Sequence, residues 1–92
     1  MDFITEPNRI FMQDEQGKIL AEVRFPNDGK DAVAITSTRV DDSLKGQGIA
    51  DQLLKAVIAE LQAQGKQTRA LCSYAVKWFE KNPEYQNLLI KD

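Results

Sequence analysis

The chain has 92 residues, of which 42% are hydrophobic and 28% charged, so we expect one small globular domain spanning residues 1–92. Its 12 basic and 14 acidic residues give a net charge of −2, which argues against electrostatic binding to nucleic acid or to an anionic membrane. There is no histidine, and Cys72 is the single cysteine, which excludes an internal disulfide, a structural zinc site and a histidine-based catalytic triad.

The first part of the chain has the pattern of antiparallel strands. Residues 9–13 form a short apolar run, and residues with turn chemistry follow it. The odd-numbered positions of residues 18–25 are apolar and mostly alternate with polar ones, which predicts a strand with one buried face. After a second turn at residues 26–29, residues 32–40 predict a third strand. These three strands are expected to form an antiparallel meander.

The middle of the chain changes to helical spacing. Apolar residues recur every three or four positions in residues 47–64, and Gly65 stands where a left-handed C-cap is expected. A short strand at residues 67–71 follows after a tight connection. The strand–helix–strand order predicts a right-handed crossover whose two strands are parallel or splayed.

The last part of the chain predicts a second, shorter helix. Ser73 is a candidate N-cap, the helix extends to about Lys81, and Asn82-Pro83 ends it before a final short turn. Trp78 and Phe79 are expected to pack this helix on the sheet, as helical aromatic residues generally do. The predicted fold class is therefore α+β: a mostly antiparallel sheet with one β-α-β crossover and two main helices packed on it.

The most informative segment is residues 44–50, Leu-Lys-Gly-Gln-Gly-Ile-Ala, between the third strand and the first helix. Small residues let backbone N–H groups at a helix N-terminus converge on an anion, most plausibly a phosphate, although the same glycines also suit a plain tight turn. A dinucleotide-binding fold needs several βαβ units, for which the chain is too short. The nucleoside-triphosphate P-loop needs Gly-Lys-Ser/Thr, which residues 48–50 do not supply.

Residues 45–50, Lys-Gly-Gln-Gly-Ile-Ala, resemble the pyrophosphate-binding motif of the GNAT acetyltransferase superfamily, Gln/Arg-x-x-Gly-x-Gly/Ala. Residues 72–75 (Cys-Ser-Tyr-Ala) and 81–85 (Lys-Asn-Pro-Glu-Tyr) are similar to the signature of a minimal GNAT-like subfamily. Its members are about this size and consist of little more than the acetyl-CoA-binding core. The similarity covers residues 32–89 and implies a GNAT-like fold with acetyl-CoA as the acetyl donor.

The resemblance also implies a coenzyme site. The amides around residues 46–50 would hold the pyrophosphate, the strand ending at Val40 would pair with the pantetheine arm, and the gap beside residues 67–71 would admit the acetyl end. Nearby Asp41, Asp42 and Asp51 work against anion affinity. The predicted coenzyme-binding residues are Thr38, Arg39, Val40, Lys45, Gly46, Gln47, Gly48, Ile49, Ala50 and Tyr74.

The resemblance makes Cys72 the candidate catalytic residue, either as proton donor or as acceptor of the acetyl group; the alternative is a small buried hydrophobic side chain. Two departures from the family pattern argue against efficient catalysis. Phe79 stands where many GNAT enzymes have a tyrosine that protonates the departing thiolate. Residues 37–40, Ser-Thr-Arg-Val, and Asn82 replace segments in which relatives carry histidine.

We therefore expect an acetyltransferase that acts on an unidentified amine or protein acceptor, without a metal. Two alternatives remain: a non-catalytic module that binds coenzyme A or senses acyl groups, and an interaction domain that uses its sheet edge. The lone cysteine, together with residues 1–6 that lack a basic and apolar leader, predicts a cytoplasmic protein. The sequence predicts neither the acceptor nor the oligomeric state.

Overall fold

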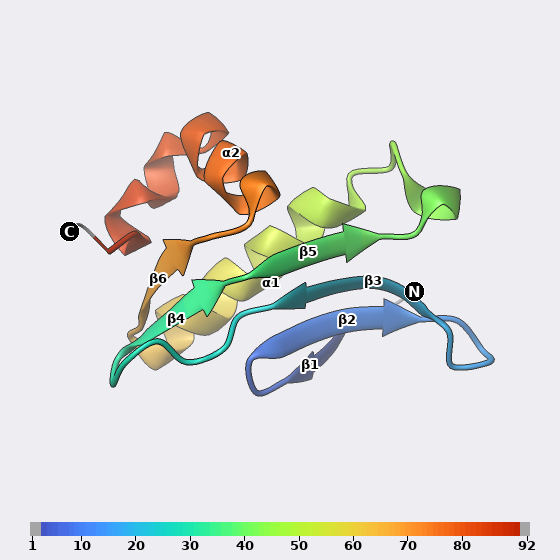
Figure 1. Ribbon diagram of the computed structural model, residues 1–92, viewed down its shortest axis with the longest axis horizontal. Coiled ribbons are helices and arrows are strands. Elements are labelled where there is room, and N and C mark those ends of the chain that lie inside the picture. Colours follow the sequence, from blue (N-terminus) through green and yellow to red (C-terminus); the bar gives the residue numbers. More distant parts are fainter. Residues whose placement is uncertain (1–2, 91–92) are drawn as a thin grey trace.

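The computed structural model describes residues 3–90 and has the expected α+β architecture (Figure 1). The strands are β1 (Ile4–Glu6), β2 (Arg9–Gln13), β3 (Ile19–Arg24), β4 (Ala32–Ile35), β5 (Ser37–Val40) and β6 (Gln67–Ala70). The helices are η1 (Asp42–Leu44), α1 (Ile49–Gln64), α2 (Ser73–Lys81) and η2 (Pro83–Leu88), of which η1 and η2 are 3₁₀-helices. β1 is an addition that the sequence pattern did not predict.

The strands form an antiparallel sheet in the order β1-β2-β3-β5 and a parallel pair of β4 with β6. β4 and β5 follow each other along one line, separated only by Thr36, so they join the two groups of strands (Figure 1). The predicted meander is confirmed, because both β2–β3 and β3–β5 are antiparallel. The predicted crossover is confirmed by the parallel pairing of β4 with β6.

The prediction of one continuous strand over residues 32–40 is wrong, and the reason lies in its hydrogen bonds. The N–H groups of Leu71 and Cys72 both donate to the carbonyl of Ile35, at 3.0 and 3.1 Å, which ends the parallel ladder. The Thr36 N–H donates instead to Arg24, and β5 then pairs only with β3. β5 and β6 therefore diverge beyond Ile35, and a gap opens between them.

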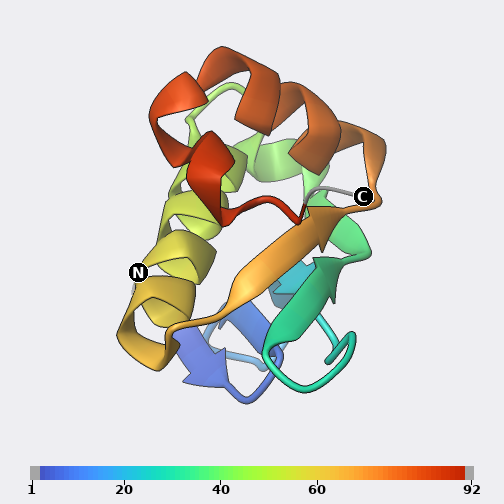
Figure 2. The same ribbon diagram turned by 90° about the vertical axis from the view of Figure 1, so that its left-hand side faces the viewer.

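The two main helices cover one face and one end of this sheet. Figure 2 shows α1 alongside the strands and α2 across the end toward which β6 points. α1 buries five apolar side chains, and α2 buries Ala75, Trp78 and Phe79, as expected for its aromatic residues. The side chains of α1 that enter the core are Leu53, Leu54, Val57, Ile58 and Leu61. None of the helices within residues 3–90 has the length and apolar character needed to span a membrane.

The helix ends differ in part from the expectations. α1 begins at Ile49 rather than at residue 47, because Gly48 is its N-cap with a left-handed backbone. Gly65 is the left-handed C-cap, with φ = 67°, as predicted. The prediction that Ser73 caps α2 is wrong: the cap is Cys72, whose Sγ accepts a hydrogen bond from the Ala75 N–H at 3.4 Å. The thiol thereby satisfies one of the helix's free N–H groups.

Glu22 departs from the simple alternation expected in β3, because its side chain is only 5% exposed. On the sheet face away from α1, its two oxygens accept hydrogen bonds from Arg9 at 2.5 Å and Arg24 at 3.0 Å. Burial alone would raise the pKa of Glu22, but the hydrogen bonds and charges of the two guanidinium groups together lower it below the ordinary value. The carboxylate therefore stays ionised inside the protein.

Candidate functional site

A hollow of about 360 Å³ lies between β5 and the start of α1. It collects most of the residues that the sequence singles out, and Gln47, Arg39 and Cys72 are the exceptions. Gln47 is an exposed residue of the same turn. The lining residues are Thr38, Val40, Leu44, Lys45, Gly46, Gly48, Ile49, Ala50, Asp51 and Tyr74.

The floor of the hollow is the turn of residues 45–48 that leads into α1. Gly46 and Gly48 have φ values of 82° and 75°, in the left-handed region that side chains rarely adopt. A Cβ at either position would meet no atom within 4 Å, so the backbone conformation rather than crowding requires glycine here. Within residues 3–90, the backbone N–H groups of residues 46–50 have no hydrogen-bond partner. Free amides at a helix N-terminus favour an anion.

Two aspartates close to this turn are already engaged. The Asp41 carboxylate caps η1 by accepting hydrogen bonds from the Ser43 N–H and hydroxyl, which hold the pKa of Asp41 below its usual value. The Asp42 carboxylate lies 2.8 Å from the ammonium of Lys45 and raises the pKa of that lysine. The Lys45 side chain is 67% exposed, and an exposed ion pair of this kind contributes little free energy.

Asp51, in the first turn of α1, is held by two donors, one from α2 and one from the next turn of α1. Its Oδ1 accepts a hydrogen bond from the indole Nε1–H of Trp78 at 2.7 Å, and its Oδ2 lies 3.1 Å from the ammonium of Lys55. These two hydrogen bonds, that of Trp78 first, lower the pKa of Asp51. The carboxylate is ionised, and both of its oxygens are occupied away from the turn.

Within residues 3–90, the edge of β5 that faces the gap has free backbone groups. Asp41 donates its N–H to Leu20 of β3 at 2.7 Å, which makes this a hydrogen-bonded pair of the antiparallel ladder. Because such pairs alternate with non-bonded ones, Ser37 and Arg39 also direct their backbone groups toward β3. Thr38 and Val40 therefore direct theirs toward the open edge, where an extended ligand with amide groups would find partners.

Cys72 lies beside the hollow but does not line it, and it contacts the lining residue Thr38. Its Sγ is 3.5 Å from the hydroxyl oxygen of Thr38, and Thr38 does line the hollow. The thiol is partly buried at the N-terminus of α2. The structure thus brings Cys72 and Thr38 together across the point where β5 and β6 diverge.

Tyr74, in the first turn of α2, completes the wall. Its ring is partly exposed, and burial, with a smaller contribution from the Asp51 charge, raises the pKa of its phenol. The phenol therefore keeps its proton at neutral pH and is a hydrogen-bond donor toward the hollow.

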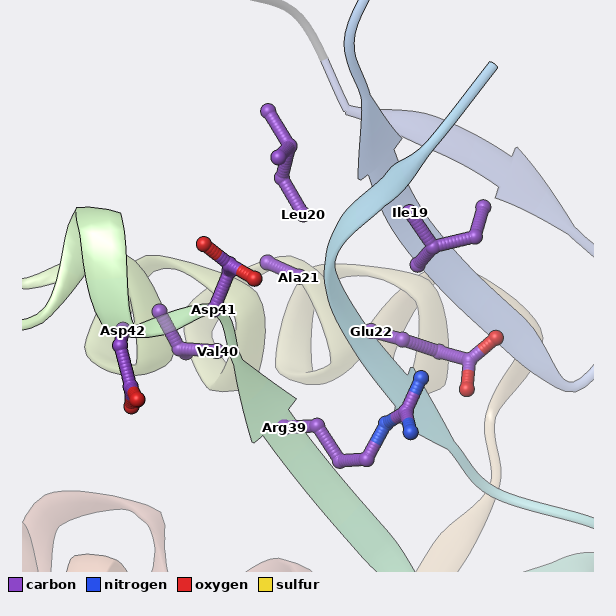
Figure 3. Close-up of a pocket in the computed structure, with 8 residues that line it drawn as sticks. All are labelled: Ile19, Leu20, Ala21, Glu22, Arg39, Val40, Asp41 and Asp42. Atoms are coloured by element: carbon purple, nitrogen blue, oxygen red, sulfur yellow. The ribbon is translucent and has the colours of Figure 1, made fainter.

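Arg39 is separated from these residues, because its side chain belongs to the opposite face of the sheet. There it lines a second hollow of about 410 Å³ together with Glu22, its direct neighbour across the strands, and the aspartates at the end of β5 (Figure 3). Figure 3 shows the Arg39 side chain extending along the sheet toward Glu22. In the described part of the chain, no cluster of side chains has the composition of a metal site.

Sequence reasoning missed the contact between Asp51 and Trp78. Asp51 was expected only to oppose an anion, and Trp78 only to pack in the core. The two residues are 27 positions apart, so no local motif links them. The one available signal was that a buried indole needs an acceptor for its N–H.

A family model described as GCN5-related N-acetyl-transferase matches residues 9–88. The match includes both main helices, the turn of residues 45–48 and Cys72. Among curated proteins, no match was found.

Solved structures with the same fold agree with this result. An NMR solution structure of a GCN5-like protein from Staphylococcus aureus is 28% identical, with a TM-score of 0.81 over 99% of this chain and 89% of that chain. A GNAT family N-acetyltransferase from Escherichia coli in complex with CoA is 23% identical, with a TM-score of 0.62 over 75% and 42% of the two chains. N-acetylglutamate synthase from Neisseria gonorrhoeae, with coenzyme A and N-acetyl-glutamate, is 17% identical, with a TM-score of 0.65 over 82% and 18%. The last two likenesses concern the fold alone.

Proposed function

The chain belongs to the GCN5-related N-acetyltransferase family, and from this membership we propose that it binds acetyl-CoA between β5 and α1 and transfers the acetyl group to an amine. The observation that carries the proposal is the set of free backbone amides at residues 46–50, at the start of a 16-residue helix. Two structures with the same fold hold coenzyme A.

In this proposal, the amides of residues 46–50 bind the diphosphate of the coenzyme. Each favourable interaction of a charge with the helix end is worth about 0.3–1 kcal/mol, so the turn supplies modest affinity. Lys45 adds a cation once it exchanges Asp42 for a phosphate. Gln47 contributes its backbone N–H rather than its exposed side chain. This part of the site needs only local geometry, which the two left-handed glycines provide.

The open edge of β5 is the natural place for the pantetheine arm, whose amides match the free backbone groups of Thr38 and Val40. An arm laid along β5 from the turn leads toward the gap between β5 and β6. The thioester end then arrives beside Thr38 and Cys72, which lie 3.5 Å apart. The backbone of Arg39 pairs with Glu22 of β3 and so helps to hold β5 in place, while its side chain lies on the other face of the sheet.

The chemistry follows from the groups at that end. Acetyl-CoA supplies a thioester whose acyl carbon is open to nucleophiles. The Cys72 thiol loses its proton to solvent and attacks that carbon, the bond to the coenzyme sulfur breaks, and the coenzyme leaves as a thiolate. An amine then attacks the acetyl group on Cys72, the bond to the Cys72 sulfur breaks, and the proton lost by the amine returns to that sulfur through solvent. In this proposal Tyr74, whose phenol stays protonated, hydrogen-bonds to the departing sulfur, and its position in the lining of the hollow supports this role. Thr38 orients the thiol through its hydroxyl.

A second function, a module that binds coenzyme A without turning it over, is favoured by two observations. Phe79, which occupies the position where many family members have a tyrosine acid, is 1% exposed and packed in the core. It therefore contributes nothing to proton transfer. The chain also has no histidine to accept the proton of the amine.

Incubation with labelled acetyl-CoA followed by intact-mass measurement separates the two functions. The transferase predicts an added acetyl group that disappears in Cys72→Ser and is discharged by an amine. Cys72→Ser is the appropriate variant because its hydroxyl is a good N-cap and preserves α2, whereas Cys72→Ala removes the cap at a cost of about 0.5–1 kcal/mol. Binding of CoA without adduct or turnover would identify the non-catalytic module. Failure to bind CoA would reject both.

A further inference from the structure

Asp51 occupies the third position of α1, counted from the N-cap Gly48. An acidic side chain at this position commonly folds back onto the free N–H of the N-cap, as in the capping box. Here such a turn of the side chain would place a carboxylate on the same amides that the proposed function assigns to the diphosphate. Asp51 is thus a built-in competitor for the anion site.

The structure shows this carboxylate directed elsewhere. Its Oδ1 accepts the indole N–H of Trp78 at 2.7 Å, and its Oδ2 pairs with Lys55 at 3.1 Å. Neither oxygen bonds to the amides of residues 46–50, which have no partner within residues 3–90. Asp51 nevertheless lines the hollow together with Gly48 and Ala50, so a carboxylate released from Trp78 would lie beside the same amides and oppose an anion there.

Of the two residues that bind the Asp51 carboxylate, Trp78 is held more rigidly than Lys55. It is 3% exposed, it stacks on Tyr85 with ring centroids 5.5 Å apart, and it packs edge-on against Phe79 at 5.2 Å. These contacts fix the direction of its N–H. Lys55, by contrast, is 57% exposed and long, so it neutralises the charge without fixing the rotamer.

We propose that Trp78 is a positioning residue for the coenzyme: its indole N–H draws the Asp51 carboxylate off the turn and keeps the amides of residues 46–50 open for the diphosphate. The inference rests on the proposed function, because it concerns the same anion site. It also assigns a role to the contact between α1 and α2. When α2, which follows Cys72 and contains Tyr74, packs against α1, its Trp78 holds the Asp51 carboxylate away from the amides that bind the diphosphate.

The test is a double-mutant cycle with coenzyme A as the titrant, measured by calorimetry at low salt. Trp78→Phe frees the carboxylate and is expected to weaken binding roughly fivefold, the size of one charge interaction at a helix end. In an Asp51→Asn background the same Trp78→Phe change is expected to have no effect, because no carboxylate remains to compete. Leu61→Val is the matched control: it alters core packing at the other end of α1, away from Asp51 and Trp78, and it should leave affinity unchanged.

An equal loss from Trp78→Phe in both backgrounds would overturn the inference, since it would show that Trp78 acts only through packing. If Trp78→Phe fails to fold, Asp51→Glu provides an independent test at a half-buried helix position. Its longer carboxylate reaches the N-cap amide and is misplaced for Trp78, so weaker binding than in Asp51→Gln is expected; equal binding would overturn the inference. Failure of the wild-type protein to bind coenzyme A would instead reject the proposed function itself.

Discussion

The hydroxyl of Thr38 lies 3.5 Å from the thiol of Cys72, which links β5 to the first turn of α2 across the gap where β5 and β6 diverge. Thr38 also lines the hollow beside the turn of residues 45–48, whereas Cys72 does not. The side chain of Thr38 is therefore the connection between the proposed coenzyme site and the one nucleophilic thiol of the chain.

Replacement of Thr38 by valine removes the hydroxyl and keeps the shape of the side chain. We expect acetylation of Cys72 at saturating acetyl-CoA to slow roughly fivefold, which corresponds to the loss of one hydrogen bond that orients the thiol. Rapid-quench intact mass measures the rate. Ser37→Ala is the control, because Ser37 is the neighbouring hydroxyl on the opposite face of β5. An unchanged rate in Thr38→Val would show that the contact does not orient the thiol.

Gly48→Ala and Gly65→Ala form a matched pair at the two ends of α1. Both glycines are left-handed, with φ values of 75° and 67°, and a Cβ meets no atom within 4 Å at either. Each change is expected to lower the free energy of unfolding by about 1 kcal/mol through backbone strain. We expect only Gly48→Ala to weaken coenzyme A binding, as seen by calorimetry beside thermal melts. Equal affinities in the two variants would contradict the role of the turn.

The ion pair between Lys45 and Asp42 predicts opposite effects from its two partners. Lys45→Gln removes a cation near the proposed diphosphate, so it should weaken coenzyme A binding and flatten the salt dependence. Asp42→Asn frees the same lysine and removes a repelling charge, so it should tighten binding. Titrations at several ionic strengths measure both effects. A salt slope that is unaltered in Lys45→Gln would show that this side chain points away from the phosphates.

The features of the fold that the sequence predicts correctly depend on residues that are close together along the chain. The alternation in residues 18–25, the helical spacing of residues 47–64 and the left-handed Gly65 all report on neighbours within a few positions. The turn of residues 45–48 belongs to the same class, since two glycines before a helix define it. Most of the hollow follows from that turn and from the strand before it.

The remaining features depend on partners distant in sequence. The division of the third strand at Thr36 arises because the amides of Leu71 and Cys72 converge on the carbonyl of Ile35. The capping of α2 by Cys72 instead of Ser73 depends on where β6 ends, within one residue. Element boundaries of this kind are set by tertiary hydrogen bonds, which the order of residue types does not encode locally.

Glu22 is the clearest case of a residue whose partners the sequence pattern does not reveal. Its contacts with Arg9 and Arg24 predict how the stability of the fold changes at acid pH. Its ordinary pKa of 4.5 is lowered in the folded protein, since the hydrogen bonds from Arg9 and Arg24 outweigh the effect of burial. A lowered pKa means that the folded state binds this proton less readily than the unfolded chain does. The contribution of Glu22 to stability is therefore complete above its ordinary pKa and is lost as the pH falls through the folded value.

Glu22→Gln should consequently lower the free energy of unfolding at neutral pH by about 1–2 kcal/mol, less than for a fully buried pair because Arg24 is largely exposed. The variant should also lose less stability than the wild-type protein between neutral pH and acid. Urea unfolding at a series of pH values measures both effects, and Glu15→Gln, in the exposed turn before β3, is the control. Parallel pH profiles for Glu22→Gln and the wild-type protein would show that the charge of Glu22 adds nothing to the fold. Arg9 would then stabilise this face of the sheet through packing alone, as its stacking over the Phe11 ring of β2 at 3.9 Å already illustrates.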